Sequence, residues 1–422
     1  MRYSEVTELT KKMTEQETNQ EIVVMKVIEN NRQNKQLGLT YAVFLMNGML
    51  ALSIGSLLPF IRDARGLDYG FCGLIVSLHS VGNLLSSFFA GTLPLAIGKK
   101  KSILIFQAAF ALSYCMILFG RGNLVLAAAF LMTGLARGAA SNYCNSKINN
   151  LAPGKAWIIN GLHAMFSIGA FVFPILLTLI TGTCADHWVY ACALMIALGV
   201  LTWILYLLIP EDEDKAVSEK TESKKESNWG FFREPIFYLV IFTLFFYLCA
   251  EQGVIGWMIT YFKDTELLSP SVSTITASVQ WMMILLGRLS AAFLSLKITK
   301  EKLLPVMGVG LVTFFIVLIF SRTTFWIMLG IVGFGYSMAG IYPTTVSFAG
   351  NLIQKYPMAW SFILTTASFG SILMPSIIGK IAASAGIAVG MSSVAVVLVI
   401  DFICIIALCI YSVRSRSEEH TF

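Results

Sequence analysis

Long apolar runs, separated by short polar breaks, follow one another along nearly the whole chain. Each run is close to the roughly 20 residues that a helix needs to cross the hydrocarbon core of a bilayer. The pattern predicts twelve spanning helices, at 38–61, 70–97, 102–120, 124–149, 157–181, 189–209, 235–262, 272–297, 303–321, 325–352, 359–383 and 387–412. A charged stretch from Pro210 to Glu234 separates the sixth from the seventh and is too polar to pack in lipid.

The same pattern divides the chain into five segments. They are a polar N-terminal tail (1–36), a first six-helix bundle (37–209), a linker (210–234), a second six-helix bundle (235–412) and a C-terminal tail (413–422). The first tail is mixed in charge and contains a short helix-like piece around Glu21–Ile28. We therefore predict an all-α integral membrane protein with twelve transmembrane helices in two bundles.

Composition agrees with this fold class. Of the 422 residues 56% are hydrophobic and only 13% are charged, whereas soluble proteins carry about 25% charged residues. Lysine and arginine gather at helix ends, 22 on the side of the N-terminus against six on the other side. This bias predicts a multi-pass protein of the plasma membrane with both termini in the cytosol. The net charge of +6 follows from these helix ends and does not indicate a nucleic-acid partner.

The sequence motifs of zinc binding and of ATP binding are missing. Most of the eight cysteines fall within apolar runs, and no Cys/His spacing typical of a zinc site occurs. A phosphate-binding Gly-x-x-x-x-Gly-Lys-Ser/Thr loop is also missing, although an ATP-driven pump needs one here or on a partner subunit. We expect no cofactor, no metal and no enzymatic reaction.

Three short patterns occur in both halves. They are Ser167-x-Gly169-x-x-x-x-Pro174 with Ser368-x-Gly370-x-x-x-x-Pro375, Ile54-Gly55 with Ile255-Gly256, and Gly82-x-Leu84 with Gly287-x-Leu289. Because each match lies in corresponding helices, the two bundles are predicted to be pseudo-symmetric. Such halves enclose a cavity at their interface and open it alternately to each side of the membrane. The architecture is that of a transporter.

Further motifs carry a resemblance to a family. They are Ala250-Glu251-Gln252 leading to Trp257, Tyr342-Pro343-Thr344 with Ser347, Ser361-Phe362 with Gly370 and Pro375, and Asn160 with His163, Ser167, Gly169 and Ala170. With these residues the chain resembles the major facilitator superfamily, and within it the fucose:proton symporter and the related glucose and galactose permeases. The resemblance covers all twelve spans and implies that spans one, four, seven and ten line the cavity.

The chain departs from the family pattern in two places. The loop between spans two and three reads Gly91-x-x-x-Leu95-Ala96-x-Gly98-Lys99-Lys100, with Leu95 where the family has an aspartate. The resemblance to the fucose symporter implies one carboxylate in span one and one in span four. At these two positions this chain has Gly55 and Ser141. Neither residue carries a proton, so Glu251 becomes the candidate for proton coupling.

Glu251 lies within span seven, beside an amide and two glycines. A charged group at bilayer depth costs roughly 2.5–3.5 kcal/mol on insertion scales, so such residues usually face a cavity. We expect it to load and release a proton; the alternative is a structural carboxylate. Arg137, midway along span four, is expected either to bind an anionic substrate through its planar fork, to pair with Glu251, or to bond to carbonyl groups.

The other substrate-binding candidates are amides, a histidine and large rings. Amides suit hydroxyl-rich ligands because each has a donor and an acceptor, although amide bonds between helices are the alternative. Trp and Tyr rings can stack on a sugar, but they also form belts at membrane interfaces. The candidates are Asn142, Asn145, His163, Gln252, Trp257, Gln280, Trp281 and Tyr342. Packing roles are expected for His79, Arg288 and Asp401.

These patterns lead to one functional hypothesis. The protein is expected to be a secondary active transporter that works by alternating access and imports a small polar, sugar-like solute in symport with protons. One alternative is a carrier of organic anions with Arg137 as counter-charge; another is a proton-coupled drug exporter with a Phe- and Met-lined cavity. The expected partners are the solute, protons and the lipid bilayer, with the protein as a monomer.

Overall fold

A computed structural model describes residues 3–151, 156–210 and 229–419. The regular structure of these residues is helical throughout. The elements are α1 (Tyr3–Arg65), α2 (Tyr69–Ile97), α3 (Lys99–Phe119), α4 (Asn123–Leu151), α5 (Ala156–Thr181), η1 (Ala185–His187), α6 (Trp188–Leu208), η2 (Trp229–Arg233), α7 (Pro235–Asp264), α8 (Pro270–Leu294), α9 (Lys300–Phe320), α10 (Thr324–Met338), α11 (Ile341–Phe348), α12 (Gly350–Lys355), α13 (Pro357–Ala385) and α14 (Ile387–Glu419).

Twelve stretches of the described residues are long and apolar enough to cross a membrane, and each corresponds to one predicted span. The predicted fold class is therefore confirmed. Two elements differ in detail. The helix-like piece at Glu21–Ile28 belongs to α1, which runs unbroken from Tyr3 because no glycine or proline occurs before Gly38. Most of the linker predicted at 210–234 lies outside the described residues.

The tenth predicted span is divided into α10, α11 and α12 instead of forming one helix. Proline explains the first break. Pro343 has no N–H group to donate to the carbonyl oxygen of Ala339, so the helical hydrogen-bond ladder is interrupted there. The chain turns at Ala339 and Gly340 before α11 begins at Ile341.

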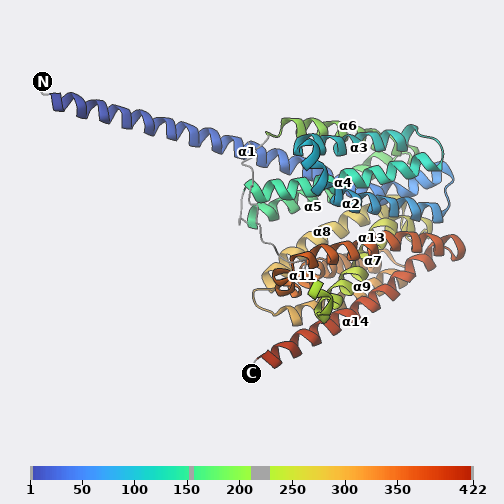
Figure 1. The fold of residues 1–422 in the computed structure, drawn as a ribbon. Helices are drawn as coiled ribbons and strands as arrows, with labels where there is room; N and C mark the ends of the chain where they lie inside the picture. The colour runs from blue at the N-terminus through green and yellow to red at the C-terminus, as the bar shows by residue number, and fades with distance from the viewer. Residues whose placement is uncertain (1–2, 152–155, 211–228, 420–422) are drawn as a thin grey trace.

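Helices α1–α6 form an N-terminal half and α7–α14 a C-terminal half, which lie against each other in Figure 1. Both chain termini extend from the same end of the molecule (Figure 1). We call this end the terminal face and the opposite end the far face. The far face contains Arg62 and Asp63 at the end of α1, and Lys263 and Asp264 at the end of α7.

Packing repeats between the halves as the duplicated motifs predict. A Cβ atom on Gly82 in α2 would lie 2.1 Å from the carbonyl oxygen of Leu131 in α4. A Cβ atom on Gly287 in α8 would lie 2.4 Å from the carbonyl oxygen of Tyr336 in α10. Both residues of the second pair follow those of the first by 205 positions. Glycine at these two positions therefore allows the same close helix–helix approach in both halves.

Charged side chains join the halves at the far face. Arg62 forms an ion pair with Asp264, and the Tyr69 hydroxyl donates to Asp264 Oδ2 at 2.8 Å. In a second ion pair the cation comes from the C-terminal half: Lys263 Nζ lies 2.6 Å from Asp63 Oδ2. These contacts tie the ends of α1 and α2 to the end of α7.

Below these ion pairs the halves pack tightly. A Cβ atom on Gly73 in α2 would lie 2.6 Å from the carbonyl oxygen of Pro375 in α13. The Ser77 and Ser376 hydroxyls in the same two helices are 2.8 Å apart. On the other flank, Ser278 in α8 donates to the carbonyl oxygen of Phe171 in α5 at 2.7 Å. The hydrogen bonds and ion pairs that we identify between the halves thus lie toward the far face.

Candidate substrate cavity

A cavity of about 300 Å³ lies between the two halves, below the contacts that close the far face. Residues of both halves line it. They come from α1 (Phe44, Ala51, Leu52, Ile54, Gly55), α2 (Val76, His79, Ser80), α4 (Arg137, Ser141, Asn145), α5 (His163, Phe166), α7 (Tyr247, Leu248, Glu251, Gln252, Ile255, Gly256), α8 (Trp281, Arg288) and α11 (Tyr342).

Helix α7 presents Glu251 to this cavity. The helix begins at Pro235, whose fixed φ angle suits the first helical position, and Glu251 lies midway along its 30 residues. Tyr247 is one turn earlier on the same face, and its hydroxyl lies 3.3 Å from Glu251 Oε1 and 3.2 Å from the carbonyl oxygen of Met338. Met338 is the last residue of α10. Tyr247 therefore connects the carboxylate to the broken helix of the C-terminal half.

Two guanidinium groups share the cavity with this carboxylate. Arg137 projects from α4 and Arg288 from α8, and both are close enough to attract Glu251 electrostatically. Although the structure describes all three side chains, it contains no ion pair between Glu251 and either arginine. The buried Nε of Arg137 has no hydrogen-bond partner among the described residues. Among the described lining residues, the cavity thus holds two permanent positive charges and one titratable carboxylate.

Most other predicted binding residues also line the cavity: Asn145, His163, Gln252, Trp281 and Tyr342. His163 is exposed, which indicates that solvent reaches the cavity wall. The Trp281 ring packs on Phe166 at 5.6 Å between centroids, and its buried Nε1 has no partner among the described residues. An indole N–H is a donor only, so a bound solute with an acceptor oxygen would satisfy it.

Three predicted binding residues lie elsewhere. Trp257 is fully buried and donates from Nε1 to the carbonyl oxygen of Pro375 at 3.1 Å. Gln280 is buried with its Nε2 3.6 Å from Met338 Sδ. Asn142 lines a different cavity, where its Nδ2 donates to the carbonyl oxygen of Gly138 at 3.0 Å. The structure does not place these three side chains at the cavity.

Several cavity residues were not among the predicted binding residues. Arg288 and His79, for which packing roles are expected from the sequence, both line the wall. Arg288 follows Asn83 by 205 positions, so a charge replaces an amide at equivalent points of the repeat. That difference between the halves is the signal that could have identified it. Asp401 is buried elsewhere, with neither carboxylate oxygen bonded among the described residues.

The two positions aligned with the family's acids also face this space. Gly55 brings α1 against α7, because a Cβ atom there would lie 2.3 Å from the carbonyl oxygen of Ile255. Ser141 in α4 accepts a hydrogen bond from Asn47 Nδ2 at 3.1 Å. Gly55 has no side chain and the Ser141 hydroxyl does not ionise in this pH range. Glu251 is the only carboxylate among the described lining residues.

Comparison with known proteins decides the family. The model of the Major Facilitator Superfamily matches residues 38–356, about three quarters of the chain. The chain belongs to this superfamily. Its members are membrane transporters, so the protein is a transporter and not an enzyme.

Individual relatives are distant but cover most of the chain. The glucose/mannose transporter GlcP of Bacillus subtilis is 24% identical over 364 residues, 80% of this chain and 86% of that protein. A TsgA homolog of Yersinia pseudotuberculosis is 20% identical over 398 residues, 93% and 99% of the two chains.

Solved structures share the fold. The nucleoside transporter NupG superposes with a TM-score of 0.71 at 15% identity, covering 90% of this chain and 99% of that one. A bacterial homolog of the human lysosomal transporter Spinster, in an inward-facing and unoccupied conformation, superposes with a TM-score of 0.73 at 13% identity, covering 90% and 97%.

Proposed function

We propose that this transporter is secondary active and imports a small polar, sugar-like solute in symport with protons. The observation that carries the proposal is that Glu251, in a cavity shared by both halves, is the one carboxylate among the described lining residues. We further propose that the protein lies in the plasma membrane as a monomer with both termini in the cytosol. The far face is then external, and the conformation described here, closed at that face, is inward-facing.

The charges in the cavity suggest how proton and solute become coupled. An ionised Glu251 compensates part of the positive charge of Arg137 and Arg288, so the empty carrier can close around the three groups. Once Glu251 is protonated, both guanidinium groups lose their counter-charge in a confined space, which is unfavourable. Solute oxygens that accept from the guanidinium N–H groups offset this cost. Closure is therefore unfavourable with a proton alone, which prevents a proton leak without solute.

The remaining polar groups suit a sugar-like solute. Asn145 and Gln252 supply amide donors and acceptors, and Trp281 adds a ring face with an unpartnered N–H. A volume of about 300 Å³ lies at the small end of ligand cavities. The similarity to a glucose/mannose transporter supports the same solute class.

A second candidate is an organic anion, such as a solute with a carboxylate. The specific observation in its favour is Arg288, which raises the count of cavity guanidinium groups to two against one carboxylate. Planar guanidinium forks bind carboxylates in bidentate fashion. The third hypothesis, a drug exporter, is not favoured, because the described lining residues include two phenylalanines and no methionine.

The test is transport by the purified protein in liposomes, with and without an imposed pH gradient, using a panel of neutral and acidic labelled sugars. We expect Glu251→Gln to abolish accumulation driven by the gradient while solute exchange at equal pH persists. The matched control is Asp401→Asn, which alters a buried carboxylate outside the cavity. Gradient-driven accumulation by Glu251→Gln at the unsubstituted rate would remove Glu251 from the coupling mechanism.

A further inference from the structure

His79 lines the cavity between the halves, and a glycine of α4 sets its position. A Cβ atom on Gly134 would collide with the backbone carbonyl oxygen of His79 in α2. Because Gly134 has no side chain, the two helices approach each other closely at this point. The imidazole ring lies beside Thr133, whose hydroxyl oxygen is 2.8 Å from His79 Nδ1. Only 4% of His79 is exposed, so close packing restricts how the ring can turn.

The Thr133 hydroxyl determines which ring nitrogen of His79 carries a proton. This hydroxyl has one hydrogen, which it donates to the carbonyl oxygen of Phe130 at 2.6 Å. It is therefore the acceptor in its bond with His79, and Nδ1 is the protonated nitrogen. In a neutral imidazole the other nitrogen, Nε2, is then an acceptor. Within the described residues Nε2 has no hydrogen-bond partner.

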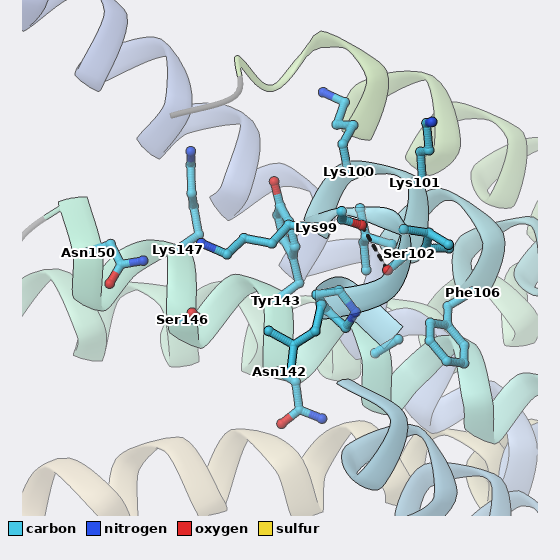
Figure 2. A pocket seen from close by; sticks show the side chains of 16 residues that line it. Lys99, Lys100, Lys101, Ser102, Phe106, Asn142, Tyr143, Ser146, Lys147 and Asn150 are labelled. Carbon is cyan, nitrogen blue, oxygen red and sulfur yellow. Dashed lines mark hydrogen bonds between the residues drawn. The ribbon is translucent and has the colours of Figure 1, made fainter. Parts of the chain in front are cut away.

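A complementary donor lies on the next turn of α4. Arg137 follows Thr133 by four residues, which puts the two side chains on one face of the helix. The Arg137 guanidinium forms no hydrogen bond with a described residue and is close enough to act electrostatically on His79. Asn142 lies on a different face and lines the separate cavity of Figure 2. The face of α4 toward the solute cavity therefore has an unpaired donor near an unpaired acceptor.

The charges of the cavity favour a neutral His79 ring. The described lining residues already include two guanidinium groups against one carboxylate. An imidazolium would add a further positive charge in a confined space, which is unfavourable. Guanidinium groups and the Trp281 indole are donors only, so they cannot receive the hydrogen of a solute hydroxyl. A neutral His79 supplies an acceptor that these groups lack.

We propose that one hydroxyl group of the solute bridges His79 and Arg137, donating to Nε2 of the first and accepting from the guanidinium of the second. This bridge, which rests on the proposed function, narrows the solute class. A sugar hydroxyl has both the hydrogen and the lone pairs that the position requires, whereas an ionised carboxylate has no hydrogen to donate. The bridge therefore selects a neutral sugar over an organic anion. Thr133 is a positioning residue that fixes the ring in its accepting form.

The state of the ring can be tested without a solute, by solid-state nitrogen magnetic resonance of the reconstituted full-length protein labelled at its histidines. The chain has four histidines, so the signal that His79→Phe removes belongs to His79. We expect a protonated Nδ1 and an unprotonated Nε2. Thr133→Val should give a mixture of both tautomers, and Thr133→Ser, which keeps the hydroxyl, should retain the single form. A proton on Nε2 in the unsubstituted protein would overturn the bridge.

The bridge itself is tested by equilibrium binding of labelled D-glucose and of its deoxyfluoro analogues, in which fluorine replaces one hydroxyl and its hydrogen. His79→Phe should bind D-glucose about tenfold more weakly, because one hydroxyl loses its acceptor. Fluorine at the bridged position should weaken binding by a similar factor in the unsubstituted protein, but little further in His79→Phe. Thr133→Val should bind D-glucose about threefold more weakly, because only part of the rings keeps the accepting form.

The matched control is His187→Phe, the same substitution at a histidine of η1 outside the cavity. It should keep the unsubstituted affinity for D-glucose. Unchanged affinity in His79→Phe would overturn the bridge and leave the proposed function intact, as would equal effects of fluorine in His79→Phe and in the unsubstituted protein at every position. Binding of D-glucuronate without binding of D-glucose would refute the neutral solute of the proposed function together with the bridge.

Discussion

The ion pair between Arg62 and Asp264 joins the two halves at the far face and should hold that face closed. The Arg62 guanidinium donates to both oxygens of the Asp264 carboxylate, which also accepts from the Tyr69 hydroxyl. Only 15% of the Arg62 side chain and 11% of the Asp264 side chain are exposed. We predict that Asp264→Asn weakens the closed state and lets the far face open more often.

The size of the effect follows from the burial and from the remaining partners. Two unit charges 4 Å apart attract by roughly 4 kcal/mol at an effective dielectric constant of 20, and removing one partner of a fully buried pair costs about 3–5 kcal/mol. The loss here is smaller, because solvent reaches both side chains and Arg62 keeps Asp63 as a partner at 2.7 Å. We expect about 2 kcal/mol, which lowers the ratio of closed to open molecules about 30-fold.

The assay is a distance measurement between two spin labels by electron paramagnetic resonance in reconstituted protein. Arg121→Cys and Thr323→Cys place the labels at exposed positions on the far face, one in each half, after Cys184→Ser has removed an exposed native thiol. Asp264→Asn should add a population at longer distance. Asp63→Asn is the control, since its carboxylate is 46% exposed and should contribute less than 1 kcal/mol.

Two results would refute this reasoning. The first is an unchanged distance distribution in Asp264→Asn. The second is a longer-distance population of equal size in Asp264→Asn and in the exposed control. Charge reversal provides a further check, because Arg62→Asp combined with Asp264→Arg should restore part of the closed population that either single change removes.

Three further predictions concern residues outside the cavity. Trp257→Phe should lower thermal stability by about 1–3 kcal/mol, because it removes the bond to the Pro375 carbonyl oxygen, yet leave solute affinity unchanged in a binding titration. Asp401→Leu should keep or raise the melting temperature, since it removes a buried carboxylate without partners among the described residues; a large decrease would reveal a hidden partner. Gly82→Ala should lower the melting temperature by forcing α2 from α4, whereas Gly38→Ala, with open space around it, should not.

Much of the fold could be predicted from hydropathy alone, because lipid forces every spanning segment to satisfy its backbone internally as a helix. The limits of this reasoning appear where a local effect overrides the apolar pattern. Pro343 breaks the tenth span within an apolar run, so the pattern predicts one helix where the structure has three. Before Gly38 the opposite occurs, since polar residues that favour helix extend α1 far beyond the apolar stretch.

The cavity was harder to predict, because hydropathy does not tell which side of a buried helix faces water. Glu251 and Arg137 could be identified, since a charge in a span has few other places to lie. The sequence alone could not exclude Trp257 and Asn142 from the residues that line the cavity. Trp257 lies about one and two-thirds turns beyond Glu251 and is covered by α13. Asn142 is three residues before Asn145, about 60° around the helix, and this rotation takes it to the neighbouring cavity.

The duplication indicates which positions determine structure and which determine chemistry. Repeated glycines such as Gly82 and Gly287 set helix spacing equally in both halves. The cavity charges lie where the repeat is broken: Glu251 is 201 positions after the buried Leu50, and Arg288 is 205 positions after Asn83. A duplicated bundle supplies a symmetric frame that can rock between two states, but a symmetric set of charges would offer proton and solute equivalent sites. In the proposed symport, the carboxylate comes from one half only, so protonation would change one wall of the cavity relative to the other, and we propose that this imbalance lets a single proton bias how the halves close.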